Sequence, residues 1–229
     1  MEILTKEGFD QRMNLIQRII MDCRTSVHNW ERIEKPKSNE RLFAEHPFTQ
    51  HLCGHYWFML ITQLAKLYAV KGNHKTTFRK LLNKLKDGEV ADDVIAILLG
   101  NRTERLNLPR GLHLWDDTVV KEKVNELEVL LSQPEIESVV KRIHDWRDKA
   151  TAHQDLTAPT EGIPSFSDLK KLTLLAENTF NKIKGGFGAG SYDLLVVGRE
   201  PDALMCLTSL GEKYRKLRHE LSRQGIELQ

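Results

Sequence analysis

The sequence predicts an all-α fold, and three observations support this prediction. Apolar residues recur at three- and four-residue steps through most of the chain, the spacing that places side chains on one face of a helix. Helix start and stop signals separate these stretches. Only residues 194–197 have strand-like character, and there is no internal repeat. We therefore expect an all-α, up-and-down helical bundle with peripheral helices, forming a single domain over residues 1–229.

Composition narrows the class of protein. The chain of 229 residues, 40% hydrophobic and 29% charged, is typical of a helix-rich protein with a substantial core. Cys23, Cys53 and Cys206 are too few and too far apart for a disulfide framework, which favours a reducing compartment. Apolar runs are shorter than a membrane span and no signal pattern opens the chain, so we expect a cytoplasmic protein without a membrane partner. With a net charge of only +2, an RNA partner requires a local basic patch.

Two long helices are predicted in the first third of the chain. The N-terminal helix, at about 6–32, has one apolar stripe. The polar segment 34–47, with two prolines, indicates a loop. The next helix, at about 48–70, has apolar side chains at helical steps and is expected to be largely buried. The stripe of the first helix consists of Ile16, Ile19, Ile20, Cys23, Val27 and Trp30.

Shorter helices are expected in the middle of the chain. Thr76 or Thr77 can cap a leucine-rich helix that ends near Gly88. A further short helix covers about 91–99. The segment 101–117 contains a proline and a glycine that break any period, so we expect it to be irregular.

Four helices complete the predicted bundle. One covers about 117–131, and the next begins near Pro134 and ends at about His153. Ser165, with Asp168 three residues later, forms a capping box that opens a helix ending at the glycine run 185–190. The last helix, at about 201–224, has a heptad-like seam, which suits both packing on its own subunit and a short coiled coil.

Two motifs lie outside this pattern, and neither indicates a functional site. His51 and His55, with His46 nearby, are spaced so that two imidazoles could share a metal ion, but the neighbouring acid of a zinc-protease motif is missing. We favour surface or half-buried histidines and expect no metal site. The glycines of 185–190 follow a helix, the reverse of the order in phosphate-binding loops, so we interpret them as a flexible connection without a cofactor.

Arg147, Asp148 and His153 form the candidate site. On a regular helix, six steps leave the arginine and the histidine about 120° apart, so they converge only if the helix ends or distorts between them. The polar run after His153 independently predicts such an end. The same residues also suit two purely structural roles: a surface ion pair of Arg147 with Asp148 or Glu137, and a histidine stabilised by the helix dipole.

The segment WRDKATAHQD resembles the signature of the HEPN superfamily, an arginine followed by a polar residue and, a few residues later, a histidine. Arg147, Asp148 and His153 occupy these positions. The stretch HYWFMLITQLAKLYAVKGNHKTTFRKLLNKL is similar to the helix-loop-helix of the abortive-infection U-type (AbiU-like) branch, in which a buried helix precedes a Thr-capped leucine helix. The resemblance covers the residues from Phe48 to Ile183 and indicates a HEPN-like core at about 48–184.

The resemblance implies a HEPN-like helical fold and, in active members, a metal-independent endoribonuclease of phage defence or toxin–antitoxin systems. RNA would be the substrate, no cofactor would be needed, and two copies would face each other in a homodimer, with an antitoxin or regulatory protein as a further partner. His153 would transfer protons and Arg147 would hold the phosphate, while Asp148 would orient either group. A catalytically inactive RNA- or protein-binding module of the same fold is the alternative.

Overall fold

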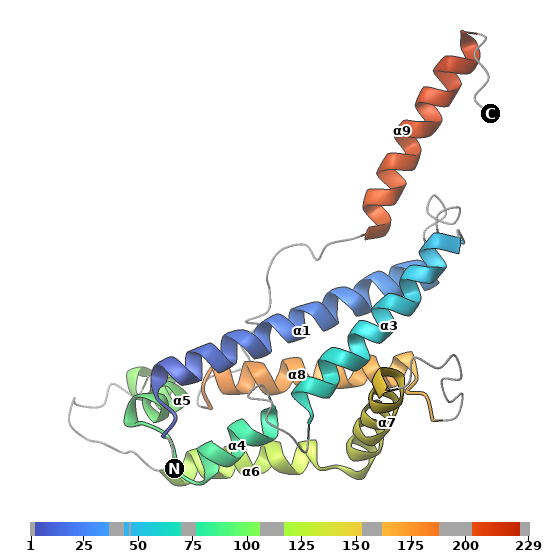
Figure 1. Cartoon of the computed structure of the whole chain (residues 1–229). Helices are drawn as coiled ribbons and strands as arrows, with labels where there is room; N and C mark the ends of the chain where they lie inside the picture. The colour runs from blue at the N-terminus through green and yellow to red at the C-terminus, as the bar shows by residue number, and fades with distance from the viewer. Residues whose placement is uncertain are drawn as a thin grey trace. The chain divides into compact units, whose positions relative to one another are not determined.

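A computed structural model of the chain describes eight helices and confirms the predicted all-α fold (Figure 1). The helices are α1 (Lys6–Glu34), α3 (Pro47–Leu67), α4 (Phe78–Lys86), α5 (Asp92–Arg105), α6 (Asp117–Leu131), α7 (Pro134–Ala152), α8 (Phe166–Lys184) and α9 (Ala203–Arg223). The structure describes residues 3–36, 44–45, 47–69, 77–105, 117–152, 162–187 and 203–224. Within these ranges, the only β pairing is a bridge between Leu4 and Val90, and no helix is long and apolar enough to cross a membrane.

The chain divides into two compact units, each considered by itself. The first comprises Met1–Cys23 and Leu60–Val197, and the second comprises Arg24–Met59 and Gly198–Gln229. Helices α1 and α3 therefore contribute residues to both units. The single domain expected over residues 1–229 stays a prediction.

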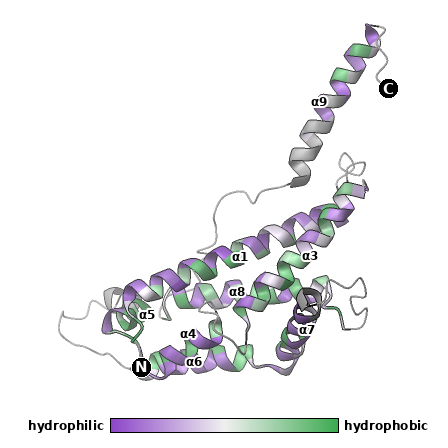
Figure 2. Cartoon of the chain, in the orientation of Figure 1, coloured by the Kyte–Doolittle hydropathy of each residue, from purple (hydrophilic) through white to green (hydrophobic). Residues whose placement is uncertain are grey.

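The core of the first unit is built from the apolar faces of its helices. In Figure 2, hydrophobic and hydrophilic residues alternate along the same helices, which is the amphipathic pattern expected from the sequence. Helix α6 packs against α4 and α5. Burial of these side chains stabilises the fold by roughly 25 cal/mol for each Å² of apolar surface removed from water. Its largest fully buried side chains are Phe9, Phe78, Phe180, Met13, Ile16, Ile20, Leu60, Ile61, Leu64, Leu67, Leu81 and Leu82.

Capping chemistry fixes the start of α4, as the sequence predicts. The Thr77 side chain accepts a hydrogen bond from the Lys80 backbone N–H at 3.3 Å. Gly88, beyond the end of this helix, has a φ of +71°, a conformation in which glycine carries no Cβ penalty.

Helix α5 is longer than expected, because it continues through residues 101–105. The prediction of irregular structure was wrong for these residues. Their side chains, which include Glu104 and two arginines, are compatible with a helix, and the proline and glycine that break the period stand further along the chain. Residues 106–116 lie outside the described part of the chain.

The beginning of the glycine run docks onto α5. Gly186 has a φ of +77°, and a Cβ at this position would lie 3.0 Å from the Leu98 carbonyl oxygen, so a glycine is required there. The next residue, Phe187, donates its backbone N–H to the same Leu98 oxygen at 2.8 Å. This contact anchors the chain after α8. Residues 188–200, with the strand-like stretch 194–197, are outside the described ranges.

Candidate functional site

The predicted site falls on the last turns of α7. This helix is described as far as Ala152, consistent with the expected end at about His153. Arg147 and Asp148 lie on the helix, whereas His153 lies outside the described residues. The geometry of the site is therefore that of the arginine, its acidic neighbour and the side chains around them.

Arg147 and Asp148 form an ion pair. The Nε and Nη2 atoms of Arg147 both donate to Oδ1 of Asp148, at 2.9 and 2.6 Å. The Arg147 side chain is 25% exposed and the Asp148 side chain 66% exposed. Such an exposed pair contributes little to stability, on the order of 0–1 kcal/mol, but it restricts the orientation of the guanidinium. Glu137 is the second carboxylate that the sequence offered as a partner for Arg147. Its Oε1 atom instead lies 3.9 Å from Nη2 of Arg79.

His144 lies on the same face of α7 and was not predicted from the sequence as a site residue. It precedes Arg147 by three residues, so the two side chains lie one helical turn apart on one side of the helix. This spacing was the signal that could have found it. The ring is half-buried, and its Nε2 has no hydrogen-bond partner among the described residues.

The environment of His144 favours the neutral imidazole. Burial lowers its pKa, and the positive charge of Arg147 lowers it further. A hydrogen bond to the backbone of Tyr68 and the carboxylates of Asp148 and Asp145 act in the opposite direction without reversing the shift. A neutral imidazole beside an arginine adds no repulsion to the positive charge of the guanidinium.

Tyr68 fixes this part of the site to the core. The residue follows α3 and is buried, and its hydroxyl donates to the Leu172 carbonyl oxygen in α8 at 2.8 Å. Burial raises the pKa of the phenol well above its ordinary value, so the hydroxyl stays protonated and acts as a donor. Tyr68 also lines a cavity of about 230 Å³ bounded by α4, α6 and α7. The backbone that contacts His144 is therefore held by a buried side chain.

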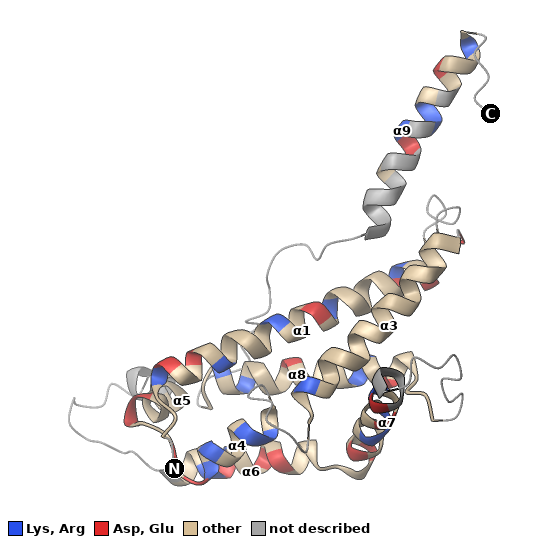
Figure 3. Ribbon diagram, viewed as in Figure 1, with Lys and Arg blue, Asp and Glu red and all other residues tan. Residues whose placement is uncertain are grey.

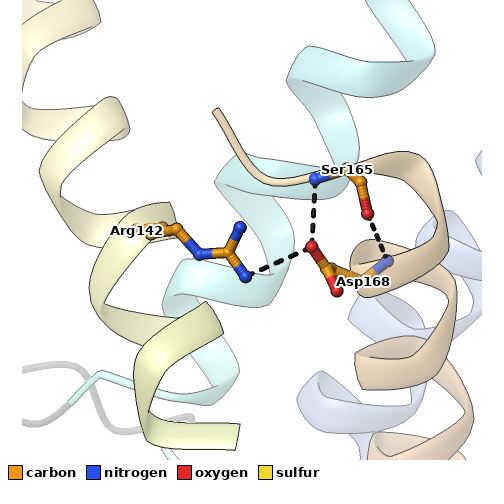
Figure 4. Close-up of polar contacts among 3 residues, drawn as sticks. All are labelled: Arg142, Ser165 and Asp168. Atoms are coloured by element: carbon orange, nitrogen blue, oxygen red, sulfur yellow. Dashed lines mark hydrogen bonds and ion pairs between the residues drawn. The ribbon is translucent and has the colours of Figure 1, made fainter. Parts of the chain in front are cut away.

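A second polar cluster joins α7 to the start of α8 (Figure 4). Asp168 accepts a hydrogen bond from the Ser165 backbone N–H, and the Ser165 hydroxyl accepts one from the Asp168 N–H, at 3.2 and 3.1 Å. The predicted capping box is thus confirmed. Arg142 adds an ion pair, with its Nη2 atom 3.2 Å from Oδ2 of Asp168.

This cluster stabilises the ionised form of the Asp168 carboxylate. Desolvation raises the pKa of its carboxyl, but hydrogen bonds from Ser165 and the charge of Arg142 outweigh it, so the pKa is lowered overall. The carboxylate therefore remains ionised and holds Arg142. The cluster links the middle of α7 to the start of α8, because one partner lies on each helix.

The histidines of α3 lie close together. The rings of His51 and His55 are in edge-to-face contact, with centroids 4.9 Å apart. Both residues are exposed. Among the described residues, no group of three or more His, Cys, Asp or Glu side chains is placed to hold a metal ion. His46 lies outside the described residues.

A model of a known protein family matches most of the chain. The family model HEPN_AbiU2, described as AbiU2, matches residues 9–200, a range that contains Arg147, Asp148 and His153. A search of curated proteins and a search of solved structures each gave no match. The helical fold and this match define a HEPN-type domain associated with abortive infection. Within that class, the chain belongs to the AbiU2 family.

Proposed function

We propose that this protein is a metal-independent endoribonuclease of the HEPN type. It would act in the cytoplasm, in phage defence or a toxin–antitoxin system, and would cut RNA at a site shared by two copies of the chain. The observation that supports this proposal most directly is the position of Arg147. Its guanidinium is partly exposed near the end of α7 and is oriented by Asp148, inside the segment that matches the family.

The proposed reaction uses the RNA's own nucleophile. An imidazole takes the proton of a 2′-hydroxyl, whose oxygen attacks the adjacent phosphorus while the bond to the 5′-oxygen breaks. The leaving 5′-oxygen receives a proton, giving a 2′,3′-cyclic phosphate and a 5′-hydroxyl end. His153 is the proposed proton-transfer group, because an imidazole can accept or donate a proton near neutral pH.

Arg147 is proposed to bind the phosphate that is attacked. A guanidinium presents donors in a plane that suits phosphate oxygens, and it stabilises the negative charge that grows on them in the transition state. Asp148 would keep this plane fixed before RNA binds. His144, neutral through burial, would avoid adding a like charge next to Arg147.

Two copies of the chain are proposed to share the site. A two-fold axis close to the end of α7 would bring two sets of Arg147 and His153 together, because symmetry places identical residues opposite each other. Single-stranded or looped RNA is the expected substrate, since its phosphates and 2′-hydroxyls are accessible. An antitoxin or regulatory protein that covers this cleft would block cleavage.

A catalytically inactive module is the second candidate. The ion pair between Arg147 and Asp148 favours it, because an arginine already bound to a carboxylate is also what a purely structural helix end requires. In that case, the protein binds RNA or another protein without cutting.

The experiment that separates the two candidates is incubation of mixed cellular RNA with the purified protein in EDTA. We expect cleavage by the wild type and a loss of about 10²- to 10⁴-fold in rate for His153→Ala. His219→Ala, which removes an exposed imidazole on α9, is the matched control and should cut at the wild-type rate. Intact RNA with all three proteins would favour the inactive module.

A further inference from the structure

One face of α7 carries both the proposed phosphate-binding arginine and part of the wall of a cavity. Glu137, Val140, His144 and Arg147 follow one another at three- and four-residue steps, so their side chains share one side of the helix. The first two of them line the cavity of about 230 Å³ next to Tyr68, whose other walls come from the end of α3, from α4 and from α6. At a rise of 1.5 Å per residue, these two positions lie about 10–15 Å along the helix from Arg147.

The inner wall of this cavity is apolar. Tyr68 and Phe78 are buried, and their rings are in tilted contact with centroids 5.9 Å apart. The Tyr68 hydroxyl donates to the Leu172 carbonyl oxygen, so its donor is already occupied. An apolar and aromatic wall of this kind suits the flat ring of an unstacked nucleic-acid base. The remaining apolar lining consists of Leu67, Leu82, Leu131 and Val140.

The exposed edge of the cavity carries charges of both signs. In Figure 3, α4 carries only basic charges, whereas α6 and α7 carry acidic ones as well. The lining residues Arg79 of α4 and Glu137 of α7 are 49% and 58% exposed, with Nη2 and Oε1 3.9 Å apart. This separation is longer than a hydrogen bond, so both groups can bind a ligand while they remain close together. The second lining carboxylate, Glu128, is held by Lys86 at 2.7 Å.

Guanine is the RNA base whose edges match this pair of charges. Its N1–H and N2–H groups are adjacent donors that a carboxylate accepts together, and its O6 and N7 atoms are acceptors for a guanidinium. Adenine and cytosine present an amino donor beside an acceptor nitrogen, which would face the carboxylate oxygens. Uracil presents its N–H between two carbonyl oxygens. The cavity is smaller than the roughly 300–1,000 Å³ of pockets for drug-sized ligands, so it suits a single base rather than a whole nucleotide.

We propose that this cavity binds a guanine base, with Glu137 accepting from its N1–H and N2–H groups and Arg79 donating to its O6 atom. The guanine belongs to an RNA strand that follows the shared face of α7 from Arg147, and this source of the base rests on the proposed function. A guanine held about 10–15 Å from the bound phosphate selects which bonds near it are cut. A free guanine nucleotide carries the same base and is the other source.

The test measures base preference without relying on cleavage. Fluorescent 2′-O-methyl oligouridines that contain a single central guanosine, adenosine or cytidine are titrated with the full chain, and anisotropy gives the dissociation constants. The oligonucleotide with guanosine should bind about tenfold more tightly than the other two, because one bidentate contact to a base discriminates by at least about this factor.

Two glutamate variants separate the cavity from general charge effects. Glu135 and Glu137 both lie in the first turn of α7, but Glu135 does not line the cavity. Glu137→Gln should bind the three oligonucleotides alike, because its amide replaces one acceptor by a donor. Glu135→Gln, the matched control, changes the net charge equally and should keep the tenfold preference. Both positions are exposed, so both variants should melt close to the wild type.

Calorimetry with guanosine and adenosine 5′-monophosphates separates the two sources of the base. A guanosine preference among the oligonucleotides that Glu137→Gln loses supports guanine in RNA. Binding of guanosine monophosphate alone, also lost in Glu137→Gln, with no oligonucleotide bound, supports the guanine site and contradicts the proposed RNA function. Oligonucleotides bound equally, with no binding of guanosine monophosphate, overturn the guanine site but leave RNA binding in place. A guanosine preference that Glu137→Gln retains also overturns it.

Discussion

The protonation of His144 is controlled by its burial and by a neighbouring arginine. Its ring is half-buried one turn before Arg147, and its pKa is lowered by burial and by that arginine. The folded protein consequently takes up this proton at a lower pH than the unfolded chain, whose histidine has an ordinary pKa of 6.5. Below this value the unfolded chain holds more protons, so the fold loses stability as the pH falls.

The prediction at this scale concerns His144→Gln. Between about pH 7.5 and pH 5.5, the free energy of unfolding should fall less in this variant than in the wild type, because glutamine does not titrate. Urea unfolding at several pH values measures this slope. His219→Gln, at an exposed position on α9, is the control and should follow the wild type. If the free energy of unfolding falls equally with pH in His144→Gln and in the wild type, this histidine is not the group that causes the loss of stability.

Some residues of the candidate site could be predicted from the sequence, and others could not. Asp148 was one of two carboxylates considered as the partner of Arg147, and the structure pairs them. His144 was missed because its significance comes from burial and from Tyr68, which is distant in the sequence and near only in the fold. The proposed role of His153 stays a prediction, since this residue lies outside the described part of the chain.

Among the secondary-structure elements, the start of α8 is the best-determined helix boundary near the site. Ser165 and Asp168 satisfy each other's backbone N–H groups, and Arg142 of α7 binds the same carboxylate. The sequence revealed the capping box because its two residues are three apart. It did not reveal Arg142, because nothing local shows which helix lies opposite the cap.

The prediction for this element is a loss of stability in Ser165→Ala. Removing the capping hydroxyl should lower the free energy of unfolding by about 1 kcal/mol, because the Asp168 N–H loses its acceptor. Urea denaturation of purified proteins measures the change. Ser167→Ala, an exposed serine in the same turn, should change stability by less than about 0.5 kcal/mol. Equal effects at both positions would mean that the cap contributes nothing specific.

Helix boundaries followed from the sequence where local chemistry decides them. A cap at Thr76 or Thr77 was predicted, and the structure places it at Thr77, while the helix from Asp117 to Leu131 was predicted correctly. The extension of α5 to Arg105 was not, because residues 101–105 are polar without being helix breakers. The helix at about 48–70 was expected to be largely buried, which was wrong for its first part, where Phe48, Phe58 and Met59 are exposed. Apolar side chains at helical spacing do not by themselves show which face of a helix is covered.

For the whole molecule, the all-α fold and membership of the AbiU2 family are established, and the proposed activity depends on one site within them. A fold of this class does not carry catalysis by itself. What distinguishes an enzyme from a binding module is whether the end of α7 acts on the 2′-hydroxyl of RNA. The reaction, rather than the fold, therefore has to be measured.

The most direct measurement compares one oligonucleotide sequence synthesised as RNA and as 2′-O-methyl RNA, each incubated with the protein in EDTA. Only the RNA should be cut, leaving a 2′,3′-cyclic phosphate, and Arg147→Ala should reduce the rate by about 10²- to 10³-fold. Cleavage of both oligonucleotides, or a rate unchanged by Arg147→Ala, would contradict the proposed mechanism.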